Sequence, residues 1–254
     1  MPSHIRRATK IVATLGPASS DISLLEKMIA TGVNVVRLNF SHGQVHDHEE
    51  RAAKVREASR RAQREVAIMA DLQGPKIRVG TFAQGKVMLR TGQAFTLDAE
   101  RETPGDIDVV GLDYRELPHD VHPGDMLLLN DGLIVLRVEA IAGSAVHTQV
   151  ILGGELSNHK GINRQGGGLT APALTAKDME DIKIAMRLQA DYVAVSFPKS
   201  ATDMEMARQL CNVAGAQWHH KPGLIAKIER AEAVPRLEEI LAVSDGIMVA
   251  RGDL

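Results

Sequence analysis

Short apolar runs alternate with amphipathic stretches over most of this chain. The stretches between the runs repeat apolar residues every three or four positions, which is typical of helices packed on one face. The runs themselves are apolar on both faces, as in strands buried inside a parallel sheet. The six runs predicted as strands lie at 10–15, 33–42, 66–72, 191–197, 224–229 and 246–254. This order of strands and helices predicts right-handed crossovers and an α/β fold.

The helical stretches carry capping signals at their ends. Ser19, Ser20 and Asp21 offer oxygens that can cap the first helix, and Gly32 is suited to end it. Thr175 and Asp178 have the spacing of a capping box before another helix. Pro235 is predicted at the first position of the last helix, where its missing N–H costs nothing.

The spacing of apolar residues along the chain changes between residues 77 and 168. Short alternating runs are separated there by turn residues such as Asn130-Asp131-Gly132, which predicts an all-β module. The candidate strands of this module are 95–97, 126–129, 133–138 and 146–150. The predicted domains are a first α/β segment at 1–76, an inserted all-β module at 77–168 and a second α/β segment at 169–254. About six β/α units are present, fewer than the eight that close a (β/α)8 TIM barrel.

The composition excludes some classes of binding partner but says little about the fold. The chain has 254 residues, 44% apolar and 24% charged, with a formal net charge of −2. A nearly neutral charge and 3% aromatic residues argue against nucleic acid and against a charged membrane surface. No apolar run reaches the roughly 18 residues that span a bilayer. The single cysteine, Cys211, is predicted in the core and fits a reducing compartment, so we expect a cytoplasmic protein.

Polar residues gather where the predicted strands end, which is where α/β folds bind their ligands. Lys227 and Glu229 lie two positions apart and therefore face the same side of their strand. Any one such group could be a structural ion pair, but recurrence on four strands favours a functional site. The residues concerned are Arg37, Asn39 and Ser41; Asp71 with Lys76 and Arg78 beyond it; Lys227 and Glu229; and Ala250, Arg251, Gly252 and Asp253.

These residue types suit metal-assisted phosphoryl transfer. Glu229 and Asp253 are hard oxygen ligands of the kind that Mg²⁺ prefers. Arg37 and Arg78 can bind phosphate with forked donors, and Lys227 can place a point charge on a phosphoryl group or an enolate. No P-loop motif is present in the sequence.

A group of histidines leaves two interpretations open. His42, His46 and His48, with Glu49, have a spacing that metal ligands could use. The same residues fit an exposed start of the helix predicted at 46–65, which is the interpretation we favour.

Five motifs together resemble those of the pyruvate kinase family, in its bacterial form. The motifs are Thr14-Leu15-Gly16-Pro17-Ala18-Ser19, Arg37-Leu38-Asn39-Phe40-Ser41-His42-Gly43, Asp71-Leu72-Gln73-Gly74-Pro75-Lys76-Ile77-Arg78, Ala226-Lys227-Ile228-Glu229 and Met248-Val249-Ala250-Arg251-Gly252-Asp253-Leu254. The resemblance implies a (β/α)8 barrel with a mobile lid and transfer of the phosphoryl group from phosphoenolpyruvate to ADP, giving pyruvate and ATP in glycolysis. It also implies Mg²⁺ (or Mn²⁺) as cofactor and a homotetrameric full-length protein.

The resemblance also implies roles for single residues. Glu229 and Asp253 would bind Mg²⁺, Lys227 would stabilise the phosphoryl group and the enolate, and Arg37 and Arg78 would bind phosphate. The backbone from Ala250 through Arg251 and Gly252 to Asp253 would hold the substrate carboxylate. The nucleotide side would consist of Thr14, Pro17, Asn39 and His42, with Asp131 contributed by the lid.

Two departures from the family pattern matter. Asn39, Ser41 and Asp71 of the family's K⁺ site are kept, but Leu72 and Lys76 stand where K⁺-dependent members carry Thr and Glu. Lys76 could supply the positive charge in place of the ion, so we expect little K⁺ dependence. The last two barrel strands and the carboxyl-terminal domain are absent from the sequence. The alternatives are therefore a non-catalytic Mg²⁺- or nucleotide-binding fragment, or a Mg²⁺-pyruvate carbon–carbon lyase.

Overall fold

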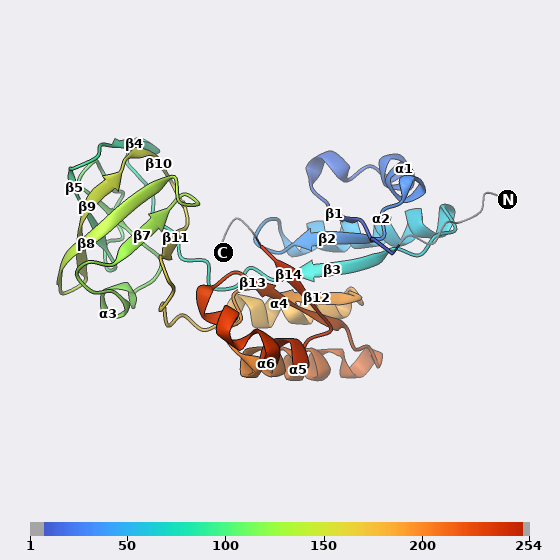
Figure 1. Ribbon diagram of the computed structural model, residues 1–254. Coiled ribbons are helices and arrows are strands. Elements are labelled where there is room, and N and C mark those ends of the chain that lie inside the picture. Colours follow the sequence, from blue (N-terminus) through green and yellow to red (C-terminus); the bar gives the residue numbers. More distant parts are fainter. Residues whose placement is uncertain (1–7, 251–254) are drawn as a thin grey trace. The chain divides into compact units, whose positions relative to one another are not determined.

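The computed structural model describes residues 8–250, which form two compact units (Figure 1). The first unit contains residues up to 74, 173–228 and 236–248, and the second contains 75–172, 229–235 and the residues from 249 onward. The predicted domain boundaries near residues 76 and 168 stay predictions.

The first unit is built on one six-stranded sheet in the order β1-β2-β3-β12-β13-β14. The pairings from β1 to β13 are parallel, and the register sets Asn39 beside Asp71 and Arg37 beside Met69. The strands are β1 (Val12–Thr14), β2 (Val35–Asn39), β3 (Ala67–Asp71), β12 (Tyr192–Val195), β13 (Gly223–Ile228) and β14 (Gly246–Val249). The predicted α/β fold with a barrel-type order of strands is confirmed.

Helices alternate with these strands, and α4, α5 and α6 lie along one side of β12, β13 and β14 (Figure 1). They are α1 (Ile22–Thr31), α2 (Val45–Arg61), α4 (Ala176–Arg187), α5 (Ala201–Gly215) and α6 (Leu237–Ala242), with 3₁₀ turns η1 (Pro17–Ser19), η2 (Ala216–Trp218) and η3 (Ala231–Arg236). Asp21 caps α1 and Gly32 ends it in the left-handed conformation, as predicted. The capping box of Thr175 and Asp178 is also present.

Two local predictions are wrong. Pro235 does not begin a helix but lies inside η3, and α6 starts two residues later at Leu237. The favoured interpretation of the histidines as an exposed helix start fails at His48 in the first turn of α2, since His48 is only 3% exposed. In the portion of the chain that the structure describes, no helix combines the length and the apolar character needed to cross a membrane.

The second unit is the predicted β module. A six-stranded sheet has the order β11-β7-β8-β9-β5-β6, and β10 pairs with β4 in a second, two-stranded sheet. Its elements are β4 (Lys86–Leu89), β5 (Ala94–Asp98), β6 (Val109–Gly111), α3 (Leu117–Asp120), β7 (Met126–Leu129), β8 (Ile134–Ala142), β9 (Ala145–Leu152), β10 (Gly154–Ser157) and β11 (Ile162–Arg164). Only β5, β7, β8 and β9 match predicted strands. The others have three or four residues, and none of them consists entirely of large apolar residues as the equally short β7 does.

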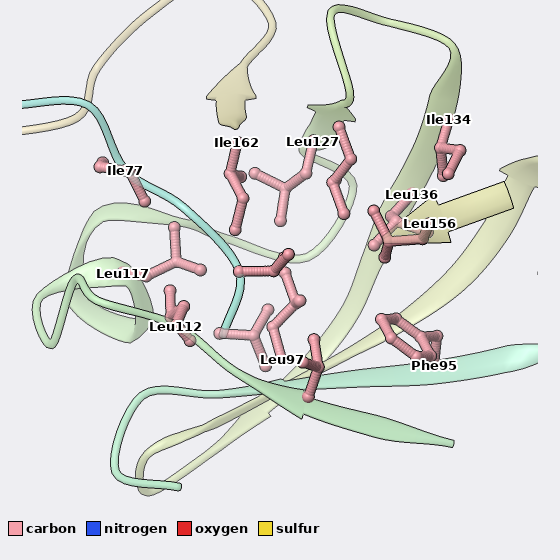
Figure 2. Close-up of a cluster of buried hydrophobic side chains, with 14 of the residues drawn as sticks. Ile77, Phe95, Leu97, Leu112, Leu117, Leu127, Ile134, Leu136, Leu156 and Ile162 are labelled. Carbon is pink, nitrogen blue, oxygen red and sulfur yellow. The ribbon is translucent and has the colours of Figure 1, made fainter. Parts of the chain in front are cut away.

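Apolar side chains from both sheets and from α3 fill the interior of this unit (Figure 2). Phe95 and Leu97 of β5 face Leu127 of β7 and Leu136 of β8, and all four are almost fully buried. The buried core gives the module a stable interior of its own.

Candidate active site

Asp71 is the buried centre of a group of charged side chains in the first unit. It ends β3, and only 1% of its surface is exposed. Arg37 of β2 donates to its Oδ2 from Nε at 2.6 Å and also contacts it through Nη2. Lys227 of β13 places its Nζ 3.2 Å from Oδ1. A buried carboxylate needs such positive partners, so the structure joins three of the predicted site residues.

Lys227 is held by a second bond that fixes its direction. Its Nζ donates to Ser196 Oγ at 2.8 Å, and Ser196 in turn donates to the backbone carbonyl of Leu72 at 2.6 Å. Lys227 is 8% exposed and Ser196 is 1% exposed. Lys227 is therefore held by a hydrogen bond to Ser196 Oγ and by an ion pair with Asp71.

Arg37 reaches from this buried group toward the surface. Its Nη1 donates to Thr14 Oγ1 at 3.0 Å, and Thr14, the last residue of β1, is exposed. Pro17, also predicted on the nucleotide side, begins η1 and is exposed as well. The carboxyl ends of β1, β2, β3 and β13 therefore carry one continuous run of polar contacts.

The last residue of β2 and the loop after it carry the other predicted residues of this unit. Asn39 Oδ1 accepts a bond from the Ser41 backbone N–H at 3.1 Å, and His42 is exposed. Beneath the loop, His48 stacks on Phe40 with ring centroids 4.2 Å apart and planes 6° apart. Burial lowers the pKa of His48, with Arg51 adding to the effect. His48 therefore supports the loop as a neutral ring.

Glu229 directly follows β13 and belongs to the second unit. Its side chain is 4% exposed. Within residues 8–250, no three His, Cys, Asp or Glu side chains form a cluster that could hold a metal ion.

The remaining second-unit residues lie on the β module. Arg78 donates from Nη1 to the His159 carbonyl at 2.8 Å. Asp131 is exposed in a turn in which Asn130, Asp131 and Gly132 all have positive φ, as expected for this turn sequence. Lys76 is half-buried and belongs to this unit too, whereas Asp71 belongs to the first.

The loop that leaves the β module after β11 is held by polar contacts within the second unit. Asp120 Oδ2 accepts from the Tyr114 hydroxyl and from the Thr170 backbone N–H at 2.8 Å. Burial and the bond to Asp120 raise the pKa of Tyr114 to about 12. Arg230 donates to the carbonyls of Leu169 at 3.2 Å and Ala171 at 3.4 Å. The segment after Glu229 thus holds the loop that leaves the module after β11.

Some of the predicted substrate site cannot be placed. Ala250 follows β14 and is half-buried, while Arg251, Gly252 and Asp253 lie outside the described residues.

Ser196 was missed by the sequence analysis. Ser196 directly follows the carboxyl end of the buried strand β12, and a polar residue at a strand's carboxyl end is the signal that identified Asp71 and Lys227. The support that His48 gives to Phe40 was missed because their ring contact is set by tertiary packing.

Comparison with known proteins gives one consistent result. Residues 6–254 match the family described as "Pyruvate kinase, barrel domain". The chain is 53% identical to Pyruvate kinase II of Salmonella typhimurium and 52% identical to Pyruvate kinase of Haemophilus influenzae, covering 100% of this chain and 53% of each relative. It is 41% identical to Pyruvate kinase of Corynebacterium efficiens over 98% of this chain and 52% of that protein. The chain spans about half the length of these relatives.

Proposed function

This chain belongs to the pyruvate kinase family, and we propose on that basis that it carries the phosphoryl-transfer residues of a pyruvate kinase. The reaction breaks the P–O bond of phosphoenolpyruvate and forms a P–O bond to the terminal phosphate of ADP. The enolate that remains takes up a proton to become pyruvate. The observation that carries the proposal is the buried group of Arg37, Asp71, Lys227 and Ser196 at the carboxyl ends of neighbouring strands.

Lys227 is the residue that we assign to the reacting centre. Negative charge passes through the phosphoryl oxygens and onto the enolate oxygen during transfer, and a fixed ammonium lowers the energy of that charge. Asp71 and Ser196 hold Nζ in place before substrate arrives, so little reorganisation is needed. Arg37 and Arg78 are assigned to phosphate binding because their forked donors match phosphate oxygens.

Mg²⁺, or Mn²⁺ in its place, would be held by Glu229 and Asp253. When bound, the ion supplies positive charge that neutralises the phosphoryl oxygens. The backbone of residues 250–253 is assigned to the substrate carboxylate, and Thr14, Pro17, Asn39 and His42 to the nucleotide. Asp131, exposed on the β module, is assigned to the nucleotide as a member of a closing lid that excludes water.

Little K⁺ dependence belongs to the same proposal. The Asp71 carboxylate already faces two protein cations, Arg37 and Lys227, and Asn39 Oδ1 already accepts a protein N–H. Lys76 is assigned as an additional charge. Replacing K⁺ with tetramethylammonium should leave the rate within about threefold, whereas a loss of about tenfold or more contradicts this assignment.

A coupled assay for pyruvate tests the proposed function. Phosphoenolpyruvate, ADP and Mg²⁺ are supplied to this chain and to an extended protein, defined as this chain continued by the remaining half of the Salmonella typhimurium relative. We expect ADP-dependent pyruvate from the extended protein. Pyruvate from neither protein, while the relative itself is active under the same conditions, would favour a non-catalytic binding role. We further propose that the full-length protein is cytoplasmic and homotetrameric, and sedimentation of the extended protein tests the oligomeric state.

A further inference from the structure

The first turn of α4 contacts two loops that carry proposed site residues. Lys177 Nζ donates to the carbonyl of Phe40 at 2.9 Å, in the loop after β2. Asp178 Oδ1 accepts from the backbone N–H of Gly74 at 3.0 Å, in the loop after β3. Adjacent residues of one helix thus hold neighbouring loops, and Asp178 is fully buried.

Asp178 has two separable bonding roles. Its Oδ2 accepts from the Thr175 backbone N–H at 2.8 Å and from the Thr175 hydroxyl at 2.7 Å, which completes the cap of α4. Its Oδ1 is used only for Gly74 among the hydrogen bonds of the described residues. Capping therefore explains one carboxylate oxygen and leaves the other to hold the loop.

Gly74 packs directly against Ser196. Its φ is +66°, and a Cβ added there would lie 2.6 Å from Ser196 Cβ and 3.2 Å from the Ser196 carbonyl oxygen. Two residues earlier, the Leu72 carbonyl accepts the Ser196 hydroxyl. The loop that Asp178 holds is therefore the wall and the hydrogen-bond acceptor that set the position of Ser196.

We propose that Asp178 is a positioning residue for Lys227, acting through Gly74 and Ser196. The proposal rests on the proposed function, because it matters to the reaction only if Lys227 serves the transferring phosphoryl group. Without the bond to Gly74, the loop moves away from Ser196, and Ser196 no longer presents its Oγ where Lys227 Nζ needs it. A displacement of about 1 Å can cost about 10²-fold in rate.

The first test needs no enzymatic activity. Hydrogen exchange at the Gly74 amide is followed by NMR in this chain and in two variants, Asp178→Ala and Thr175→Ala. Thr175→Ala is the matched control, since it weakens the same cap but leaves the oxygen that binds Gly74. We expect Asp178→Ala to speed Gly74 exchange at least about tenfold, and Thr175→Ala to leave it slow. Equal exchange in both variants would overturn the proposal.

The second test uses pyruvate formation by the extended protein. Asp178→Ala should lower kcat by about 10²-fold with little change in KM for phosphoenolpyruvate, because Lys227 acts in the transition state. In a Ser196→Ala background the same change should cost almost nothing more. A role through Ser196 would be contradicted if Asp178→Ala lowered kcat as much in the Ser196→Ala background as it does alone. It would also be contradicted if Thr175→Ala lowered kcat as much as Asp178→Ala.

A third variant guards against failure of Asp178→Ala to fold, and the exchange test guards against failure of the extended protein to make pyruvate. Asp178→Asn keeps the side-chain volume and replaces the charged acceptor with a weaker neutral one. If Asp178→Ala does not fold, Asp178→Asn is compared with Thr175→Ala in the same two tests. If the extended protein makes no pyruvate while the Salmonella typhimurium relative does, the proposed function is refuted, and the Gly74 exchange result then decides the positioning of the loop by itself.

Discussion

Removing the charge of Asp71 should destabilise the first unit strongly, and removing Lys227 as well should restore some of the loss. Asp71 is 1% exposed and lies 3.2 Å from Lys227 Nζ. Two unit charges at this distance attract by about 5 kcal/mol at an effective dielectric of about 20. Asp71→Asn keeps an oxygen for Arg37 but removes the carboxylate charge that lies 3.2 Å from the buried ammonium of Lys227. We expect it to cost about 3–5 kcal/mol of unfolding free energy.

The chain provides its own probe for this measurement. Trp218 is the single tryptophan and lies in η2 of the first unit, so its fluorescence during urea unfolding reports on that unit. The variants to compare are Asp71→Asn, Lys227→Met and the double variant. The double variant removes both buried charges, so its loss should be smaller than the sum of the two single losses by at least about 1.5 kcal/mol.

Additivity would refute this reasoning. If the two single losses sum to that of the double variant within about 0.5 kcal/mol, the side chains do not interact as the 3.2 Å separation implies.

Three further predictions concern single buried positions. Burial raises the pKa of the Cys211 thiol to about 12, so at pH 8 a disulfide reagent should label the native chain at least about 100-fold more slowly than the urea-unfolded chain; equal rates would contradict its burial. Burial lowers the pKa of His48, so the stability gained from its neutral ring is complete above about pH 6.5 and is lost as the pH falls. The urea midpoint followed by Trp218 should therefore drop from pH 7 to pH 5, and His48→Phe should reduce that drop; an unchanged drop excludes His48 as its source. Gly74→Ala combines a positive φ with a methyl 2.6 Å from Ser196 Cβ and should cost at least about 2 kcal/mol by circular dichroism. Gly85→Ala, with φ +77° and open space around it, should cost less, and equal losses would show that the contact with Ser196 contributes nothing.

Local sequence signals predicted most of the first unit. Apolar runs identified β2, β3 and β13 because these strands are buried in a parallel sheet. Alternation of side chains along a strand places Arg37 and Asn39 on one face of β2, but the same prediction fails for Ser41, because β2 ends at Asn39. Capping boxes act within one turn, so the pairing of Thr175 and Asp178 was also predictable.

Contacts between distant residues were not predictable in this way. The bond between Gly74 and Asp178 joins residues 104 positions apart, and nothing in either local sequence signals it. The short strands of the β module, such as β6 and β11, are set by their sheet partners rather than by their own pattern. His48 has the sequence pattern of a polar residue at a helix start, but the loop after β2 places Phe40 on its ring.

Lys227→Met in the extended protein tests the central claim most directly. A single turnover of phosphoenolpyruvate with ADP is followed by phosphorus NMR, and Mn²⁺ binding is followed in the same samples by electron paramagnetic resonance. We predict that phosphoryl transfer slows by at least about 10²–10³-fold while Mn²⁺ still binds, since the metal carboxylates are untouched. A Lys227→Met protein that transfers the phosphoryl group at the unaltered rate would contradict the account.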